Sequence, residues 1–170
     1  GTPIPPEDRL QNLKIVGCEM EGYQLDKYSQ MDLSVSDDDY GAFNSTAIMS
    51  SNIVFPYGTD EPIKRLISKN GFTNLIKEDK KGLTFKSDDY SNYFKKTEIG
   101  QYSSKLKAII DGIETSNGIV FIYSQYIYAG VLPIALTLEM NGFSKLGGSL
   151  IKGKKEDPND KKYIIISGND

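Results

Sequence analysis

The sequence predicts an α/β fold in which a central parallel sheet is flanked by helices and interrupted by long loop insertions. The prediction rests on an unbroken apolar run at residues 119–123, which has a helical pattern on each side. A short run of β-branched and aromatic residues without alternation is typical of a strand covered on both faces, as in a parallel sheet. A second strand is expected at residues 163–166, which makes a right-handed βαβ unit. An aspartate in place of Val120 or Ile122 is therefore expected to unfold the domain.

The two helices beside this run are predicted from their periodicity and from residues that begin or end helices. Ser103 and Ser104 can cap the first helix, because a serine hydroxyl accepts hydrogen bonds from the free amides of a first turn. Apolar residues at helical spacing form one face of it: Leu106, Ile109, Ile110 and Ile113. The second helix is expected to begin near Ala129 and to accept Pro133 in its first turns. It should end at residues 141–142, where Asn and Gly readily adopt a left-handed conformation.

The rest of the chain is expected to complete a single domain over residues 1–170. Residues 13–20 read as a strand and residues 21–30 as the helix that follows it. A short helix is expected to begin at Asp60 and to end at residues 70–71, which are Asn and Gly.

Two polar segments are predicted to be flexible insertions in this domain. Residues 32–51 contain three consecutive aspartates among Ser, Gly and Asn, and have few apolar side chains to bury. Residues 144–162 form a long hydrophilic segment between the second helix and the last strand. Loops of this length in compact domains are usually functional or mobile.

Polar residues directly after the two predicted strands are the candidate site residues. Ser124 and Gln125 follow the first strand, and Ser167 and Gly168 follow the second. Open α/β sheets place their ligand contacts at the carboxyl ends of strands. Hydroxyl, amide and backbone donors there can bind phosphate or sugar oxygens without reading a base sequence. The alternative is that these residues only form turns or cap the next helix.

Three other side chains could also contact nucleic acid. Lys105, in the first turn of its helix, could reach a phosphate, although most lysines in such positions face solvent. Tyr126 and Tyr128 could offer stacking faces to bases. The alternative for the two tyrosines is partial burial at a seam of the fold.

Residues 148–155 resemble a phosphate-binding loop, but they lack two of its requirements. Lys155 stands where a Ser or Thr would bind magnesium, and the segment does not run from a buried strand into a helix. We therefore expect a solvated loop in which Lys154→Ala leaves the melting temperature nearly unchanged. Contact with a phosphate backbone is the alternative, because lysines cluster in and after this segment: Lys152, Lys154, Lys155, Lys161 and Lys162.

Composition limits the possible functions further. The chain has 20 basic and 23 acidic residues and a pI of about 5.1, so any site for a polyanion must be local. It has no histidine, which excludes Ser–His and Cys–His pairs and the usual zinc sites. Cys18 is the single cysteine, and no apolar run approaches the roughly 20 residues of a membrane span. These features predict a soluble protein of a reducing, intracellular compartment with no membrane contact.

Several segments together resemble the second RecA-like lobe of superfamily 2 helicases. The resemblance lies in the order of residues 102–106 and 119–124, followed by Gly130 and residues 138–142. It is strongest toward the Swi/Snf-like branch of large DNA viruses, which includes the poxvirus early transcription factor and nucleoside triphosphatase helicases. Earlier positions that agree with it are residues 18–20, Gln24, Tyr28 and residues 51–56.

This resemblance implies a partial RecA-like lobe from a viral, ATP-dependent helicase with a role in transcription. It implies that Ser124 and Gln125 belong to helicase motif IV and that Ser167 and Gly168 form the next backbone-contacting turn. The implied partners are single- or double-stranded nucleic acid and a first helicase lobe. ATP and magnesium are implied for the parent protein, and none is expected on this fragment. The implied location is a viral factory or the virion.

Two functions are compatible with the sequence. The first is a piece of a helicase or translocase that supplies nucleic-acid backbone contacts. Because residues 148–155 lack a magnesium ligand and no acidic box is present, the isolated chain is not expected to hydrolyse ATP. The second is a RecA-like or Rossmann-like adaptor module without catalytic activity, which binds protein partners.

Overall fold

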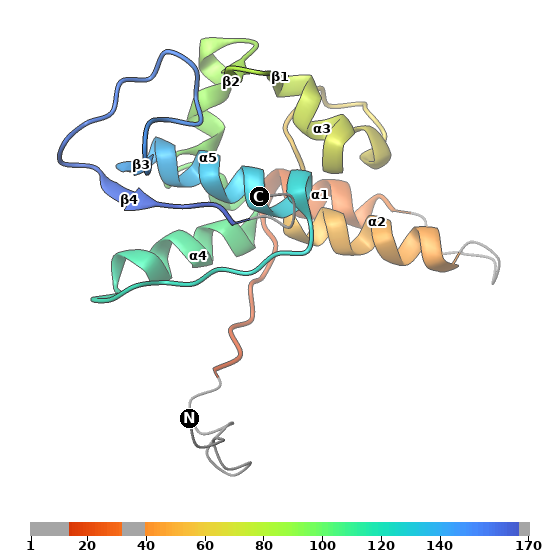
Figure 1. Ribbon diagram of the computed structural model, residues 1–170. Coiled ribbons are helices and arrows are strands. Elements are labelled where there is room, and N and C mark those ends of the chain that lie inside the picture. The colour runs from red at the N-terminus through yellow and green to blue at the C-terminus, as the bar shows by residue number, and fades with distance from the viewer. Residues whose placement is uncertain (1–13, 32–39, 167–170) are drawn as a thin grey trace.

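The computed structural model describes residues 14–31 and 40–166 (Figure 1). Its α-helices are α1 (Gly22–Ser29), α2 (Tyr40–Asn52), α3 (Ser68–Leu75), α4 (Ser104–Glu114) and α5 (Leu132–Met140). Shorter helical segments are η2 (Ile63–Arg65), η3 (Asp88–Phe94), η4 (Ile99–Gln101) and the π-helix η5 (Ile127–Val131). The strands are β1 (Ile76–Asp79), β2 (Gly82–Phe85), β3 (Phe143–Lys145) and β4 (Lys161–Tyr163).

The fold is a mixed α/β arrangement with two small sheets. β1 and β2 form an antiparallel hairpin, and β3 and β4 form a parallel pair. The predicted last strand is therefore found a little earlier, at β4, and its parallel partner is β3. A large central parallel sheet is not formed by the residues that the structure describes.

The prediction of a buried central strand at residues 119–123 is wrong. This segment is extended but pairs with no strand, and Ile119, Phe121 and Tyr123 are at least 80% exposed. The expected strand at residues 13–20 is also unpaired over its described part, where Ile15 is 87% exposed. An apolar run is buried only if other strands flank it, and here the core is filled by helices instead.

Exposure of residues 119–123 reverses the expected effect of a charge there. Val120 is 43% exposed, so the carboxylate of Val120→Asp can stay hydrated. We expect the variant to remain folded, with a free energy of unfolding within about 0.5 kcal/mol of the parent, as is usual for surface substitutions. Urea unfolding monitored by circular dichroism measures this difference. Loss of the cooperative transition would show that the run is covered as a central strand would be.

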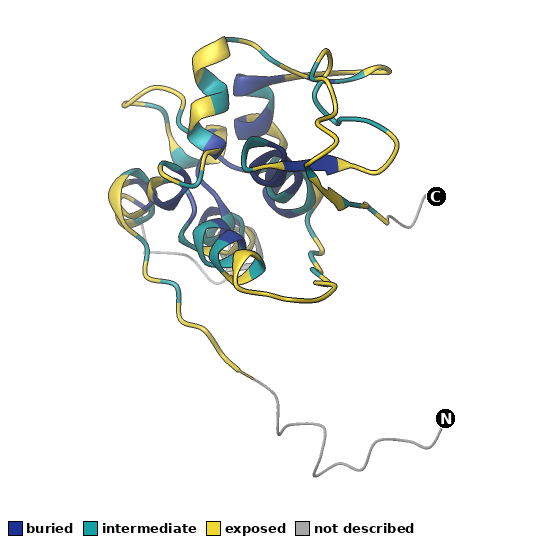
Figure 2. Cartoon of the chain, turned by 90° about the vertical axis from the view of Figure 1, so that its left-hand side faces the viewer, coloured by how far each residue is buried: buried dark blue, intermediate teal, exposed yellow. Residues whose placement is uncertain are grey.

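The core lies around α5, which is apolar except for the buried Thr137 and Glu139. Leu136 on α5 is fully buried, and the largest core cluster also contains Phe55, Phe72 and Phe94. The rings of Phe55 and Phe72 meet edge to face with centroids 6.0 Å apart. Figure 2 shows buried residues along α5 and into β3, the strand that follows it. A helix without a polar face requires such an environment, because any exposed side would leave apolar surface in water.

The helices expected on either side of residues 119–123 are confirmed. The Ser103 hydroxyl caps α4 by accepting from the amide of Leu106 at 3.0 Å, and Ile110 on the predicted face is buried. α5 carries proline in its first turn and ends before Gly142, whose φ is +83°. A π-helical turn, η5, precedes α5 where a plain helix start was expected.

The helix predicted to begin at Asp60 is formed differently. A short 3-10 turn, η2, is followed by α3, which runs through Gly71 instead of ending there. Gly71 packs closely, because a Cβ atom at this position would meet the carbonyl oxygen of Leu66 at 2.4 Å and the ring of Phe55 at 2.6 Å. This glycine is therefore needed for packing, and its use as a stop signal was wrong.

Of the two predicted insertions, the first is helical over its described part, while residues 146–160 form an irregular connection between β3 and β4. Residues 40–52 form α2, which contributes buried Ser50 to the interior, and Ile53 directly after it is also buried. Residues 32–39 lie outside the described part of the chain. Residues 144–162 are tied down by strand β4 and by a bridge between Leu83 and Ile151. Polar content alone did not reveal these contacts, because they depend on partners far along the chain.

Candidate nucleic-acid interface

Ser124 forms the turn that leads into η5. Its hydroxyl accepts from the Tyr126 amide and donates to the Tyr126 carbonyl, both at 3.2 Å. The hydroxyl also lies against the α-carbon of Gly130, where an added Cβ atom would come within 2.0 Å of it. The alternative that this serine is a turn-forming residue is therefore confirmed by its contacts.

Gln125 occupies the outer side of the same turn. Its side chain is exposed, and among the described residues its amide makes no hydrogen bond. An amide of this kind can donate to an oxygen of a phosphate and can accept from a sugar hydroxyl. The structure thus separates the two predicted residues, with Ser124 shaping the turn and Gln125 presenting a free polar group.

Tyr126 and Tyr128 are partly buried and pack against the core, which agrees with the alternative that they lie at a seam of the fold. The Tyr128 ring lies 5.4 Å from the Phe72 ring, and its hydroxyl donates to Glu78 at 3.0 Å. Lys69 covers the same ring at 5.5 Å from its centroid. Burial, with the Glu78 carboxylate nearby, raises the pKa of Tyr128. This side chain is held by three neighbours, as expected of a tyrosine at a seam of the fold.

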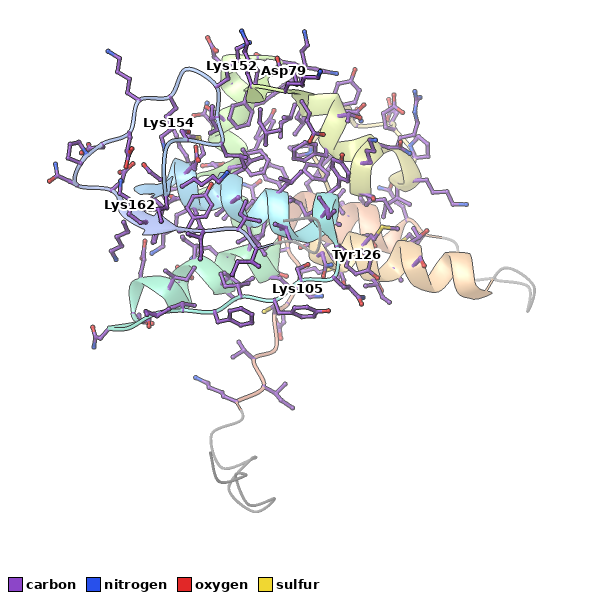
Figure 3. The ribbon with its side chains drawn as sticks, viewed as in Figure 1. Asp79, Lys105, Tyr126, Lys152, Lys154 and Lys162 are labelled. Carbon is purple, nitrogen blue, oxygen red and sulfur yellow. The ribbon has the colours of Figure 1, made fainter. Side chains whose placement is uncertain are left out.

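Lys105 lies at the start of α4 and contacts the end of α2. Its ammonium group donates to Ser51 Oγ at 3.0 Å and to Asn52 Oδ1 at 2.9 Å, while the residue as a whole is exposed. α2 contacts both α4 and η5, so Lys105 and the Ser124 turn border the same helix. Figure 3 shows Lys105 close to Tyr126 in that view. The positive charge of Lys105 therefore lies at the end of α2, the helix that η5 also contacts.

Gln24 joins the helices that support this region. It is fully buried, and its amide nitrogen donates to the carbonyl oxygens of Ser50 at 2.9 Å and Ser51 at 3.3 Å. Its amide oxygen accepts from the backbone N–H of Ser104 at 2.9 Å. One side chain therefore satisfies the last carbonyls of α2 and a first amide of α4. Gln24 is a packing residue and not a ligand-binding one.

The remaining predicted site residues, Ser167 and Gly168, lie outside the described residues. Of the five candidates, Ser124 and Gln125 lie on the turn before η5, and Lys105 lies on α4. Both η5 and α4 contact α2.

Two of the three lysines of residues 148–155, and Lys162 after them, make internal contacts. Lys154 donates to the carbonyl oxygen of Phe143 at 3.3 Å and to that of Glu139. Lys152 pairs with Asp79 at 3.5 Å, and Lys162 pairs with Glu156. Figure 3 marks these side chains along the loop. The residues present do not form a phosphate cradle, and the expectation that Lys154→Ala is neutral is not supported by these contacts.

Glu139 organises this loop and was missed by sequence reasoning. Its side chain is completely buried and accepts from the amides of Leu150 at 2.5 Å and Ile151 at 3.4 Å, and from the hydroxyls of Tyr163 and Ser149. Burial and the charge of this carboxylate raise the pKa of Tyr163 far above its usual range. A single acidic residue inside an otherwise apolar helix was the signal that could have revealed it.

Other kinds of site receive no support from the part of the chain that is described. Over residues 14–31 and 40–166, no three acidic, cysteine or histidine side chains gather into a group that could hold a metal ion. None of the helices formed there combines the length and the apolar character that crossing a bilayer requires. The chain matches no family model, no curated protein and no solved structure in the comparisons made.

Proposed function

We propose that this chain is part of the second lobe of an ATP-dependent helicase or translocase and contacts the backbone of nucleic acid through the Ser124–Gln125 turn. The observation that carries the proposal is the free, exposed amide of Gln125 on a turn fixed by Ser124. The resemblance of residues 99–143 to the second RecA-like lobe of superfamily 2 helicases supports it. The RecA-like assignment and a role in viral transcription rest on that resemblance.

Each of the site residues has a distinct part in the proposed contact. Ser124 fixes the turn, Gln125 donates to phosphate oxygens, and Lys105 adds a positive charge at the neighbouring helix. Contacts of this type are made to the backbone and carry no base preference. Binding should weaken as salt increases, because each phosphate that a lysine neutralises releases counterions. ATP, magnesium and a first lobe are part of the proposed parent protein. Among the described residues, residues 148–155 do not form a loop that could hold the phosphates of ATP.

Replacing Gln125 with alanine tests the proposal. We expect the Kd for a fluorescein-labelled oligothymidylate, measured by anisotropy at low salt, to rise about two- to tenfold, because one neutral hydrogen bond contributes roughly 0.5–1.5 kcal/mol. The same increase is expected for a labelled oligoadenylate. The matched control is Gln30→Ala, which truncates an exposed glutamine just after α1 and should leave both values unchanged.

An adaptor that binds protein partners is the second candidate function. It is favoured by the exposed apolar side chains on unpaired extended segments, among them Ile15, Ile119, Phe121 and Ile166. Extended chain with free backbone groups is a template for a strand from a partner. On this function, Gln125→Ala binds both oligonucleotides as the parent does, so the same titration distinguishes the two candidates.

A further inference from the structure

Gly130 lies directly beneath the turn that presents Gln125. A Cβ atom built on Gly130 would meet Ser124 Oγ at 2.0 Å, Ser124 Cβ at 2.9 Å and Tyr126 Cβ at 3.6 Å. Real Cβ atoms essentially never come within 3.0 Å of a heavy atom outside their own residue and its two chain neighbours. The φ angle of Gly130 is not in the left-handed region, so the absence of a side chain serves this contact and not an unusual backbone conformation.

The same glycine belongs to the π-helical turn η5. Here the Val131 amide donates to the Tyr126 carbonyl at 2.9 Å, the same carbonyl that accepts from the Ser124 hydroxyl. The turn and the helix are thus joined at one oxygen atom. Single π-turns are uncommon and frequently occur at functional sites. A change at Gly130 is therefore transmitted to the turn by direct contact with Ser124.

We propose that Gly130 and Ser124 form a packed pair that holds Gln125 toward solvent, which makes Gly130 a positioning residue for the nucleic-acid contact. This inference rests on the proposed function for its ligand, a phosphate backbone read without base preference. Gly130 touches no ligand itself. It acts by leaving the space that the Ser124 hydroxyl occupies.

The test compares Gly130→Ala in three backgrounds that differ in the size of residue 124. With serine present, the new methyl group displaces the hydroxyl, and the Kd for oligothymidylate should rise by the same two- to tenfold as in Gln125→Ala. Combining it with Ser124→Ala removes the 2.0 Å clash but leaves the 2.9 Å one, and Ser124→Gly removes both. Only the combination with Ser124→Gly should bind as tightly as its Ser124 single variant, and the melting temperature lost through Gly130→Ala should return partly with Ser124→Ala and most fully with Ser124→Gly.

A second comparison separates positioning from a general loss of structure. Adding Gly130→Ala to Gln125→Ala should raise the Kd no further, because the side chain that Gly130 positions is already absent. Gly112→Ala in α4, where a Cβ atom would meet nothing within 4 Å, should leave the Kd unchanged and should not lower the melting temperature, because alanine favours a helix interior more than glycine does. All Kd values are compared at a temperature at which circular dichroism shows every variant folded.

The outcomes distinguish this inference from the proposed function. If residue 124 has no influence on the effect of Gly130→Ala on melting temperature, the packed pair is wrong, whatever the chain binds. If Gly130→Ala and Gln125→Ala raise the Kd additively, Gly130 does not act through Gln125. If the melting temperatures follow the expected order while Gln125→Ala binds like the parent, the pair stands and the proposed function fails.

Discussion

Replacing Glu139 with alanine should lower the melting temperature by on the order of 10 °C, measured by differential scanning calorimetry. The carboxylate is fully buried, and Lys154 approaches it at 4.0 Å. Removing the carboxylate leaves the two amides and two hydroxyls that donate to it without their acceptor, and each buried polar group left in this way costs about 1–3 kcal/mol. For a chain of this size, each kcal/mol shifts the melting temperature by roughly 2–4 °C.

The loss should be concentrated in the segment that Glu139 anchors. Without the carboxylate, the amides of Leu150 and Ile151 lose their acceptor, and the bridge between Ile151 and Leu83 loses its support. Hydrogen exchange should therefore accelerate first at residues 148–155. Glu156→Ala is the matched control, since it removes an acidic residue of the same loop from an exposed pair with Lys162. Such pairs contribute about 0–1 kcal/mol, and an effect of Glu139→Ala no larger than that would contradict the anchoring role.

Gln24→Met should also lower the free energy of unfolding strongly, by roughly 3–5 kcal/mol. Three backbone groups lose their partner, and each buried polar group left in this way costs about 1–3 kcal/mol. Methionine has nearly the same length but can neither donate to Ser50 and Ser51 nor accept from the Ser104 amide. The ends of α2 and α4 would lose their shared partner. Chemical denaturation with urea, followed by circular dichroism, measures the change.

The control for this variant is Gln30→Met, an equal substitution at an exposed position after the end of α1. It should change the free energy of unfolding by no more than about 0.5 kcal/mol. Equal effects of the two substitutions would show that Gln24 does not join the three helices.

Local signals in the sequence predicted α1, α4 and α5 well, but not α2 or α3. Ser103 and the apolar spacing of the helix that follows it were sufficient for α4, because capping and one-sided burial are properties of a few neighbouring residues. The run at residues 119–123 was misjudged for the opposite reason. Whether such a run is buried depends on which strands lie beside it, and no local pattern contains that information.

The arrangement of the candidate site residues was predicted only in part. Ser124 and Gln125 were found from their position after an apolar run, but their different roles depend on the contact with Gly130, which lies across the turn. Glu139 was invisible to motif reasoning because its partners lie on a loop that looked solvated. Lys105 was recognised, but its contacts with the end of α2 were not.

Photo-cross-linking tests the central claim, that the Ser124–Gln125 turn lies against a nucleic-acid strand, most directly. The chain is irradiated with an oligonucleotide that carries 4-thiothymidine, and the cross-linked peptides are identified by mass spectrometry. We expect cross-links within residues 119–131, which are reduced in Gln125→Ala and unchanged in Gln30→Ala. Cross-links confined to the lysine-rich residues 148–162, or equal in all three proteins, would contradict the claim.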